Sequence, residues 1–351
     1  MIPPKDLKER IKVKARELGF ILAGVTLPEP PAHYTTFENW LAQGHHGTMN
    51  YLAEERSRLR RADPKQILPE CRSILVLATA YPSPGGRGQG EGENIFTGNI
   101  ASYARGADYH DILPARMKEL VQFIEQQVGG PVKNRWYTDT GPILERDLAQ
   151  RAGIGWIGRN TCLINPKQGS YFLLSEIFLD LALEPDPPFT TDHCGTCTRC
   201  IQACPTDCIL PNRTLDATRC ISYLTIELKE DIPLELREEI GDWVFGCDIC
   251  QQVCPWNRFA PEGDPAFDSK TPLPSLTEEL TLTPQAFNGR FKLSPVKRAK
   301  RRGYLRNVAV ALGNTADMHA LPVLQNALND EERMIREHAQ WAIEQIKKRE
   351  Q

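Results

Sequence analysis

Cysteine spacing is the feature of this chain that most directly indicates chemistry. Nine of the eleven cysteines lie between residues 194 and 254. The run Cys194-x2-Cys197-x2-Cys200-x3-Cys204-Pro is the bacterial ferredoxin pattern, in which three thiolates bind one [4Fe-4S] cluster and the fourth binds a second. The run Cys247-x2-Cys250-x3-Cys254-Pro supplies further ligands. We therefore expect two clusters, one bound by Cys194, Cys197, Cys200 and Cys254, and the other by Cys204, Cys220, Cys247 and Cys250.

A zinc site and disulfides are the alternatives for clustered cysteines. Zinc sites usually pair two Cys-x2-Cys units and rarely use the longer string found here. Disulfides are disfavoured in a reducing cytoplasm. We expect a cytoplasmic protein, because the first 20 residues show neither an apolar signal core nor a twin-arginine pair. Cys208 is left without a ligand role, and Cys71 and Cys162 are expected to be small buried hydrophobic residues.

The composition is that of an ordinary soluble protein of two or three domains. The chain has 351 residues, of which 41% are hydrophobic and 25% charged. Its formal net charge of -3 does not indicate a nucleic-acid partner for the chain as a whole. No run of 18 apolar residues occurs, so we expect no membrane-spanning segment. Nothing in the pattern indicates an obligate oligomer, and a monomer is the default expectation.

Residues 1–185 predict an α/β or α+β domain around one sheet, because strand and helix patterns alternate. The Gly-rich segment 82–94 contains no G-x-G-x-x-G in the required register and no Walker lysine, so we interpret it as a surface loop. The expected helices cover residues 5–18, 33–61, a stretch that follows segment 105–111 and ends at 128, and residues 142–153, the last with Pro142 in its first turn. The expected strands cover residues 74–80, 100–104 and 133–137, followed by an antiparallel pair formed by residues 161–165 and 170–183.

The second half of the chain divides into a cysteine-rich part and a helical part. The proline-rich stretch at 185–188 marks a boundary, after which we expect the two-cluster domain over residues 186–260 and a connector over 261–293. Residues 294–351 show apolar residues at helical spacing and resemble a HEAT repeat, two antiparallel helices with a proline opening one of them. One short array of this kind is too small for a solenoid, so we interpret it as a docking appendage.

Three glycine-containing segments outside the cluster domain could hold a further redox centre or the substrate. They cover residues 102–110, 138–142 and 155–161, and each combines glycines with polar or aromatic side chains. Asp139 is either a local turn carboxylate or a general acid, and an acid would need desolvation or nearby negative charge to keep its proton. His110 is more simply a core or helix-start residue. The basic stretch 290–306 is either a solvated face or a track for phosphates.

Several motifs together identify a family that this chain resembles. YARGADYHD, YTDTGPILERDLAQRAGIGWIGRNTCLINPKQGSYFLLSEI, CGTCTRCIQACPT and the pair CISYLTIE and GCDICQQVCPWN are similar to epoxyqueuosine reductases, and the resemblance covers nearly the whole chain. It implies an α+β architecture: a nitroreductase-like cobalamin-binding α/β domain, a ferredoxin-like two-cluster domain and a C-terminal HEAT-like helical repeat. It also implies reduction of the epoxide of epoxyqueuosine at the tRNA wobble position to queuosine, with base-off cobalamin reduced through two [4Fe-4S] clusters.

The resemblance further implies roles for individual residues. Asp139 would be the catalytic proton donor. Ser102 stands where some relatives have cysteine, so a cysteine there is not expected to be essential. The implied cofactor-binding residues are Arg61, Ser102, Tyr103, Asp139, Trp156, Ile157, Gly158, Leu163, Gly169, Ser170, Ser222 and Asp248. The candidates for tRNA contact are Lys297, Arg298, Lys300, Arg301, Arg302 and Arg306, with Arg58, Arg60 and Arg61 as a second group.

The expected partners are tRNA carrying epoxyqueuosine and a flavodoxin- or ferredoxin-type electron donor. Two alternative functions remain open at this point. One is a reductive dehalogenase-like cobalamin enzyme, although those enzymes usually carry a twin-arginine signal and lack a HEAT-like tail. The other is a two-cluster electron-transfer protein that binds no cobalt.

Overall fold

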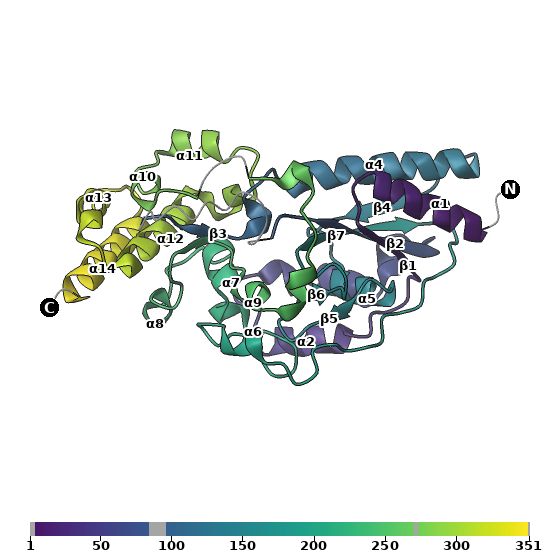
Figure 1. Cartoon of the computed structure of the whole chain (residues 1–351), viewed down its shortest axis with the longest axis horizontal. Helices are drawn as coiled ribbons and strands as arrows, with labels where there is room; N and C mark the ends of the chain where they lie inside the picture. The colour runs from purple at the N-terminus through teal and green to yellow at the C-terminus, as the bar shows by residue number, and fades with distance from the viewer. Residues whose placement is uncertain (1–3, 84–95, 270–272, 350–351) are drawn as a thin grey trace.

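The computed structural model describes residues 4–83, 96–269 and 273–349, so most of the predicted Gly-rich loop lies outside the described residues. The molecule is elongated, with its N-terminus at one end of the long axis and its C-terminus at the other (Figure 1). A four-stranded sheet occupies the N-terminal half, three helices form the C-terminal end, and the cysteine-rich segment lies between them (Figure 1). No helix within the described ranges is long and apolar enough to cross a membrane.

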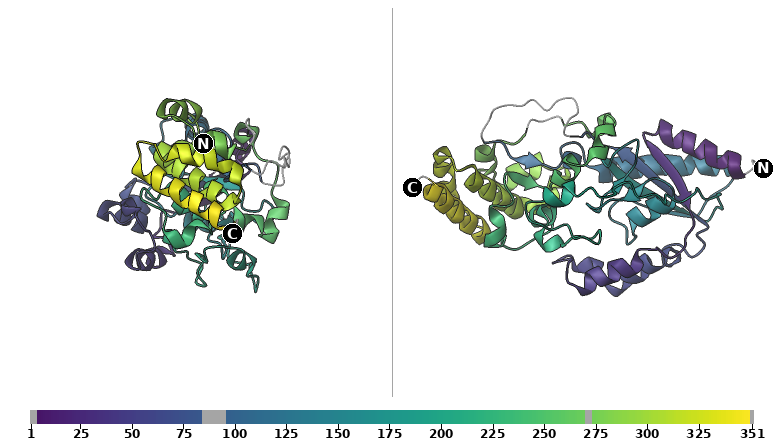
Figure 2. Two further views of the ribbon diagram at one scale, coloured as in Figure 1. Left: turned by 90° about the vertical axis from the view of Figure 1, so that its left-hand side faces the viewer. Right: turned by 60° about the horizontal axis from the view of Figure 1, so that its bottom comes forward.

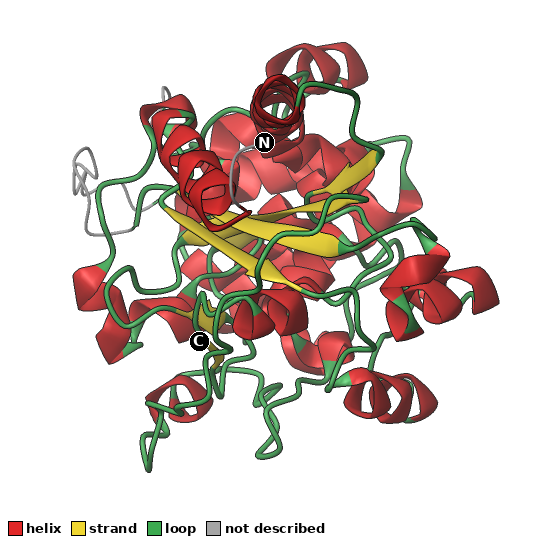
Figure 3. Cartoon of the chain, turned by 90° about the vertical axis from the view of Figure 1, so that its right-hand side faces the viewer, coloured by secondary structure: helices red, strands yellow, loops and turns green. Residues whose placement is uncertain are grey.

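The main sheet is entirely antiparallel and has the order β1-β2-β7-β4. Alternation along β2 sends Leu75 and Leu77 to one face of the sheet, and Ile74 and Val76 to the other. The sheet therefore buries both faces, one under α1 and α4 and the other against α5. Helices lie on both sides of the strands in Figure 3. The bounds of these elements are α1 Pro4–Glu17, β1 Leu22–Thr26, β2 Ser73–Ala80, α4 Tyr109–Val128, β4 Asn134–Tyr137, α5 Glu145–Arg151 and β7 Phe172–Leu179.

The sheet confirms the predicted central strand, since all eight residues of β2 are buried. The helix expected over 33–61 was wrong in detail, because it is divided into α2 (Tyr34–Ala42), the 3₁₀ turn η1 (Asn50–Leu52) and α3 (Glu55–Ala62). Gly44 and Gly47, with φ of 70° and 58°, turn the chain between α2 and η1. These helices lie along one side of the molecule (Figure 2).

Two further local expectations were corrected by the structure. The strand expected over 100–104 is only β3 (Asn99–Ile100), which pairs in parallel with β8 (Trp243–Phe245) and leads into the 3₁₀ turn η3 (Ser102–Ala104). The helix expected from Pro142 begins at Glu145, because residues 138–144 form a turn in which Asp139 has φ of 60°.

The predicted antiparallel pair 161–165 and 170–183 was also wrong. Instead, β6 (Leu163–Ile164) pairs with β5 (Trp156–Ile157), and β7 pairs with β2 and β4. A single bridge between Asn165 and Gly169 is what the described part of the chain retains of that pair.

The cysteine-rich segment consists of short helices joined by turns. Two of them, α6 and α9, pack against each other, and each carries part of one cysteine run. The connector expected over 261–293 contains two short helices, whose residues Leu276 and Phe287 are buried against the C-terminal helices. The bounds are η2 Pro64–Gln66, α6 Arg199–Gln202, η4 Ala217–Arg219, α7 Ile221–Ile226, α8 Leu234–Arg237, α9 Ile249–Gln252, η5 Pro255–Phe259, η6 Pro265–Phe267, α10 Leu276–Glu279 and α11 Pro284–Arg290.

The C-terminal part of the chain is helical, as predicted. The 3₁₀ turn η7 (Pro295–Ala299) leads into α12 (Lys300–Thr315), and η8 (Met318–Ala320) leads into α13 (Leu321–Ala327) and α14 (Arg333–Arg349). The apolar residues predicted to face a helical core are buried there, among them Leu305, Val308, Leu312, Leu324, Ile335, Ala339, Ala342 and Ile346. Helix α12 lies at the centre, because α14, α10 and β8 pack against it.

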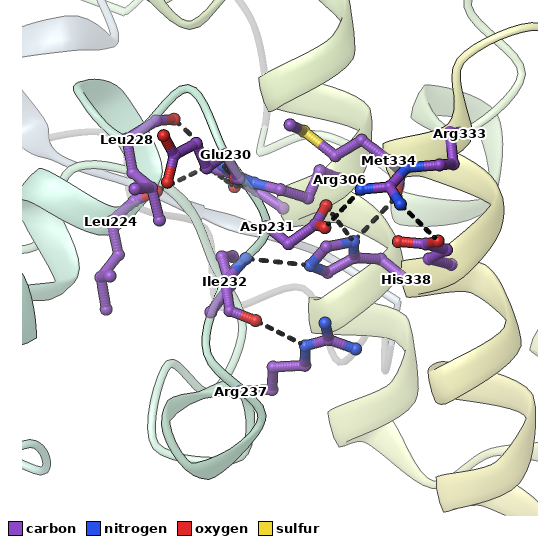
Figure 4. A network of polar contacts seen from close by, with 12 residues as sticks. Leu224, Leu228, Glu230, Asp231, Ile232, Arg237, Arg306, Arg333, Met334 and His338 are labelled. Atoms are coloured by element: carbon purple, nitrogen blue, oxygen red, sulfur yellow. Dashed lines mark hydrogen bonds and ion pairs between the residues drawn. The ribbon is translucent and has the colours of Figure 1, made fainter. Parts of the chain in front are cut away.

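A buried polar network joins this helical part to the cysteine-rich segment (Figure 4). The Arg306 side chain is fully buried and donates to the backbone oxygens of Leu224, Leu228 and Glu230 at 2.5–3.0 Å. His338 is also fully buried: its Nε2 accepts from the Ile232 N–H, and its Nδ1 lies 2.7 Å from the Met334 oxygen. Segment 224–232 is thereby held against α12 and α14.

The pH dependence of this junction follows from His338. Burial first, then the nearby Arg237 cation, lowers the pKa of His338 to about 3. Below about pH 6.5, the ordinary pKa of histidine, the unfolded chain therefore binds a proton at this side chain that the folded protein does not bind. The free energy of unfolding consequently decreases as the pH falls from about 6.5 towards 3. We expect His338→Gln, whose amide can keep both hydrogen bonds, to flatten the fall in thermal midpoint between pH 6.5 and 5. An unchanged pH profile in this variant would contradict the assignment.

Candidate functional site

The first predicted cluster-binding set comes together in space. Cys194, Cys197, Cys200 and Cys254 line one cavity, together with His193 and Trp256. Three of these cysteines come from the loop and first turn of α6, and the fourth follows α9 directly, so the α6–α9 packing brings residues 60 positions apart into one site. Burial raises the pKa of Cys254 to about 11, and the thiols of Cys194 and Cys200 are among its neighbours. A bound iron cluster would reverse this, because coordination favours the thiolate.

The second predicted set is also clustered. Burial raises the pKa of Cys247 well above its usual range, and the neighbouring thiols of Cys220 and Cys204 act in the same direction. Cys250 has Cys247 and Cys220 among its charged neighbours. These four half-buried cysteines therefore lie in one region, and the donor chemistry of both sets fits [4Fe-4S] clusters.

Two further cysteines lie beside the second set. The Cys208 sulfur is 3.4 Å from the Cys204 sulfur, although its spacing in the sequence gave it no role. Cys162 was expected in apolar surroundings, but its thiol contacts the Cys250 thiol instead. Cys71 is the small buried residue that was predicted, and its thiol donates to the Ser73 backbone oxygen at 3.3 Å.

An aromatic cluster covers the first set. The indole N–H of Trp156 donates to the Cys194 sulfur at 3.4 Å, and the Trp156 ring stacks on Phe189 with centroids 5.7 Å apart. Trp256 and His193 complete the cluster, with ring centroids 5.3 Å and 4.9 Å from that of Trp156. An N–H donor and exclusion of water both tune the potential of an iron–sulfur cluster.

We expect Trp156→Phe to lower the midpoint potential of the cluster on Cys194 by roughly 30–60 mV, the equivalent of about 1 kcal/mol in a one-electron couple. The indole N–H stabilises the more negative reduced cluster, and phenylalanine keeps the ring but removes that donor. An anaerobic redox titration followed by electron paramagnetic resonance measures the shift. Phe189→Leu is the matched control, since it removes an aromatic contact and leaves the N–H in place. Equal potentials in wild type and Trp156→Phe would refute this role.

Asp139 is held in a defined position at the end of β4. Its backbone has φ of 60°, which is uncommon for a residue with a side chain, and its N–H donates to the Glu145 carboxylate at 2.6 Å. The Tyr109 hydroxyl donates to Asp139 Oδ2 at 2.8 Å, and the Arg298 guanidinium approaches the same oxygen at 3.3 Å. His110 Nε2 lies 3.8 Å away. The carboxyl group itself remains half exposed, with 49% of its side chain accessible.

Two further carboxyl groups lie behind Asp139, that of the half-buried Glu145 and that of the buried Glu176. Loss of hydration first, then the charge of Asp139, raises the pKa of Glu145 to about 8. Glu176 on β7 is completely buried, and burial, then Glu145 and Asp139, raises its pKa well above the usual range. Both oxygens of Glu176 lack a hydrogen-bond partner among the described residues. Burial and the neighbouring negative charges therefore favour the protonated forms of the carboxyl groups close to Asp139.

The structure brings several predicted cofactor-binding residues to this region. Burial raises the pKa of Tyr103, and the charges nearest to it include Asp139 and Asp248. The Ser102 N–H donates to Asp248 Oδ2 at 2.7 Å. Because Asp248 stands between Cys247 and Cys250 in the sequence, this hydrogen bond connects the second cysteine set with the Asp139 region. Arg61 is buried, and Glu145 is one of its charged neighbours. Sequence segments 61, 102–103, 139 and 248 therefore meet at one place.

Other predicted cofactor-binding residues lie apart from Asp139. Trp156 faces Cys194, and Ile157, Gly158 and Leu163 belong to the β5–β6 hairpin, where Leu163 is buried in the core. The Ser170 N–H donates to Asn257 Oδ1, and the Ser170 hydroxyl donates to Gln251 Oε1. Gly169 has φ of 66°, and a Cβ there would meet the Asn257 side chain. The Ser222 backbone hydrogen-bonds to the Cys220 sulfur. Their contact with a cofactor stays a prediction.

In the structure, the residues of the basic stretch 290–306 lie in different environments. Arg306 is removed from the candidates for tRNA contact, because its buried guanidinium is occupied by backbone oxygens. Arg301 is paired with Asp330 at 2.5 Å. Arg298 bridges Glu227 and Asp139, and so belongs to the Asp139 region as well. Lys297 and Lys300 are exposed and Arg302 is half-buried. In the second group, Arg58 is paired with Glu38, Arg61 is buried and Arg60 is half-buried.

A cavity of about 150 Å³ lies beside Asp139. Tyr109, His110 and Arg298, which surround the carboxyl group, line it together with Lys292 and Lys297. Sequence reasoning did not identify Tyr109, Glu145 or Arg298 as partners of Asp139. Arg298 lies 159 residues away along the chain, so no local pattern could have placed it there.

Two family models match parts of this chain. The "4Fe-4S double cluster binding domain" covers residues 193–257, and "Epoxyqueuosine reductase QueG, DUF1730" covers residues 61–140. The first match includes all eight predicted ligands, and the second ends one residue after Asp139.

Relatives match over almost the full length. Epoxyqueuosine reductases from Pseudomonas aeruginosa and Xanthomonas campestris pv. campestris are each 40% identical to this chain; each alignment covers 97% of the chain, and 94% and 97% of the relatives. The chain belongs to the epoxyqueuosine reductase family. It is therefore an oxidoreductase with a double-cluster domain.

Solved structures of epoxyqueuosine reductases share the fold. One, in complex with an epoxyqueuosine-modified tRNA-Tyr stem loop, has a TM-score of 0.88 at 32% identity and covers 97% of this chain and 90% of its own. Another, from Streptococcus thermophilus, has a TM-score of 0.89 at 30% identity, with coverage of 98% and 91%. The mixed helix-and-sheet fold described above is thus that of the epoxyqueuosine reductase family.

Proposed function

We propose that this chain reduces the epoxide of epoxyqueuosine in tRNA to the alkene of queuosine, with two [4Fe-4S] clusters and cobalamin as its cofactors. The observation that carries the proposal is the position of Asp139. It is half exposed beside a cavity, held by Tyr109 and Arg298, and backed by protonated carboxyl groups, in a chain that is 40% identical to epoxyqueuosine reductases over 97% of its length.

The reaction takes up two electrons and two protons, and the epoxide oxygen leaves as water. Cobalamin and the clusters supply the electrons when they are bound. Asp139 supplies a proton to the departing oxygen, for which its half-exposed carboxyl group is accessible. The Tyr109 hydroxyl fixes Oδ2 of that carboxyl, and the N–H bond to Glu145 fixes the turn that carries it. Protonated Glu145 provides a nearby proton source once Asp139 has given up its own.

The residues near Asp139 fit a cobalamin. Tyr103 and Asp248 link this region to the cysteines of the second set, so a cofactor held here would lie next to a cluster. Glu176 leaves two buried oxygens without partners in the described structure, as expected beside a site for a polar cofactor. Cobalt analysis of protein purified without oxygen separates this proposal from a two-cluster electron-transfer protein.

The decisive experiment supplies reduced holoprotein with tRNA that carries epoxyqueuosine. Nucleosides from the digested tRNA are then examined by mass spectrometry. Loss of one oxygen mass from the modified nucleoside is the expected result. An unchanged nucleoside, in the presence of fully loaded clusters and cobalamin, would overturn the proposed function. Halide release from organohalides under the same conditions would instead support a dehalogenase.

The finer architecture belongs to the same proposal. The sheet domain over residues 1–185 would be nitroreductase-like, residues 186–260 would form the ferredoxin-like domain, and the helices over 294–351 would be a HEAT-like repeat. The enzyme would act as a cytoplasmic monomer, where its tRNA substrate is found. A flavodoxin- or ferredoxin-type protein would reduce it.

The exposed Lys297 and Lys300 and the half-buried Arg302 are proposed to contact the tRNA backbone. The triple replacement of Lys297, Lys300 and Arg302 by alanine is expected to weaken binding of a tRNA anticodon stem loop and to reduce the slope of log K against log salt by roughly 2. Binding is measured by fluorescence anisotropy between low and moderate salt. Lys347→Ala combined with Lys348→Ala, at the far end of α14, is the control and should leave the slope unchanged. An unaltered slope in the triple variant would exclude this surface.

A further inference from the structure

A second cavity is larger than the one beside Asp139. It is an open hollow of about 1060 Å³ lined by residues of α6, α9 and η5. Its lining includes Arg199, Gln202, Gln252, Cys254 and Arg258. Apart from Cys254, the residues that line this hollow have no part in the proposed chemistry or in the proposed tRNA contacts.

The hollow adjoins the first cysteine set. Its wall shares Arg199, Cys254 and Pro255 with the cavity into which the four cysteines of that set point. A cluster bound there would lie directly behind the wall of the hollow. The second set lies on the other side, towards Asp248 and the Asp139 region. The first cluster is therefore the one that a partner on this surface could reach.

The charge of the hollow is positive on a chain whose net charge is -3. Arg199 and Arg258 are exposed, and neither is paired with an acidic residue in the part of the chain that the structure describes. The described lining contains no aspartate or glutamate. Arg258 lies over the ring of Phe259, 4.6 Å from its centroid, and 42% of Phe259 is exposed. Two unpaired arginines, of which Arg258 lies over an exposed aromatic ring, are suited to an acidic protein surface.

We propose that this hollow is the docking surface for an acidic one-electron carrier protein that reduces the cluster on Cys194, Cys197, Cys200 and Cys254. The inference rests on the proposed function in one respect only, that the clusters receive electrons from outside. In each transfer one electron leaves the carrier, which is oxidised, and the cluster passes from its 2+ to its 1+ state. Small, electrostatically steered contacts are typical of electron-transfer partners, because the carrier must also leave quickly.

The test uses the holoenzyme and a bacterial flavodoxin in its anionic hydroquinone form, which becomes the neutral semiquinone on losing one electron. Bleaching of cluster absorbance in an anaerobic stopped-flow instrument gives the second-order rate constant. We expect Arg199→Glu combined with Arg258→Glu to lower that constant at least tenfold at low salt, and the difference to shrink as salt rises. Arg258→Glu alone, which does not alter the cysteine run, should show a smaller effect in the same direction. Arg135→Glu, an equal charge change at an exposed arginine on β4, is the control.

Dithionite separates docking from damage to the cluster, because a small reductant needs no protein surface. Variants that keep full cluster content and wild-type reduction by dithionite, but lose reduction by flavodoxin, support the proposal. Flavodoxin rates equal to wild type in Arg258→Glu and in the double variant would overturn it. So would weaker binding of the tRNA stem loop with unchanged flavodoxin rates, since the hollow would then be an RNA surface. Failure of epoxide reduction does not affect this test, which measures only the clusters.

Discussion

Asp139→Asn is expected to reduce epoxide turnover by about 10²–10⁴-fold, the usual contribution of a general acid, while both clusters and the cobalamin remain bound. Asparagine has the shape of aspartic acid and still offers an oxygen to the Tyr109 hydroxyl, so the turn should keep its geometry. It also tolerates the positive φ of this position. The substitution removes the acidic proton and the charge that the carboxylate offers to Arg298. Turnover is measured in single-turnover reactions with dithionite-reduced protein.

Two companion variants distinguish proton donation from positioning. Tyr109→Phe removes the hydrogen bond to Asp139 Oδ2 but leaves the acid in place, so its loss of activity should be much smaller. Glu145→Gln keeps an acceptor for the Asp139 N–H and removes a group that is protonated up to about pH 8, so it should alter the pH profile of turnover above neutrality. Normal turnover in Asp139→Asn, with full cofactor content, would show that another group gives the proton.

The sequence predicted the redox chemistry better than the geometry around it. The two cysteine sets could be predicted because each cysteine run is local, and the α6–α9 packing then brings Cys254 to the first set. The central strand β2 could be predicted from the sequence, because an uninterrupted apolar run of strand length is typical of a strand that is buried on both faces. The expected pair of strands around residues 165–170 failed for the opposite reason. A turn signal indicates that the chain reverses direction, but it does not determine which strands pair. In the structure β7 pairs with β2 and β4, and not with β6, its neighbour in the sequence.

The Asp139 region shows where local patterns stop being informative. Its contacts come from Tyr109, Glu145 and Arg298, which belong to three different parts of the chain. The basic stretch had been treated as one surface, yet it begins in the Asp139 region with Arg298 and ends in the core with Arg306. Charge in a sequence cannot distinguish these environments, because a buried arginine and an exposed one have the same letter. Burial is decided by what packs on α12, and those elements are distant in sequence.

Arg306→Met is expected to destabilise the protein by about 3–5 kcal/mol, the cost typical of removing one partner from a buried charged network. Methionine fills similar volume, but it leaves the backbone oxygens of Leu224, Leu228 and Glu230 buried without a donor. Since these oxygens belong to the cysteine-rich segment and Arg306 to α12, the loss should fall on the junction between the two (Figure 4). Differential scanning calorimetry gives the size of the effect, and limited proteolysis shows whether cleavage concentrates near residues 224–232.

Arg302→Met is the matched control, because it makes the same chemical change one turn earlier on α12 at a half-buried position with no hydrogen bond in the described structure. Its effect should stay within about 0.5 kcal/mol, as is usual for surface substitutions. The two variants also separate the two interpretations of the basic stretch. Arg302→Met should weaken tRNA binding and leave the thermal midpoint nearly unchanged, whereas Arg306→Met should lower the midpoint first. Equal midpoints for Arg306→Met and wild type would mean that segment 224–232 is held by its apolar contacts alone.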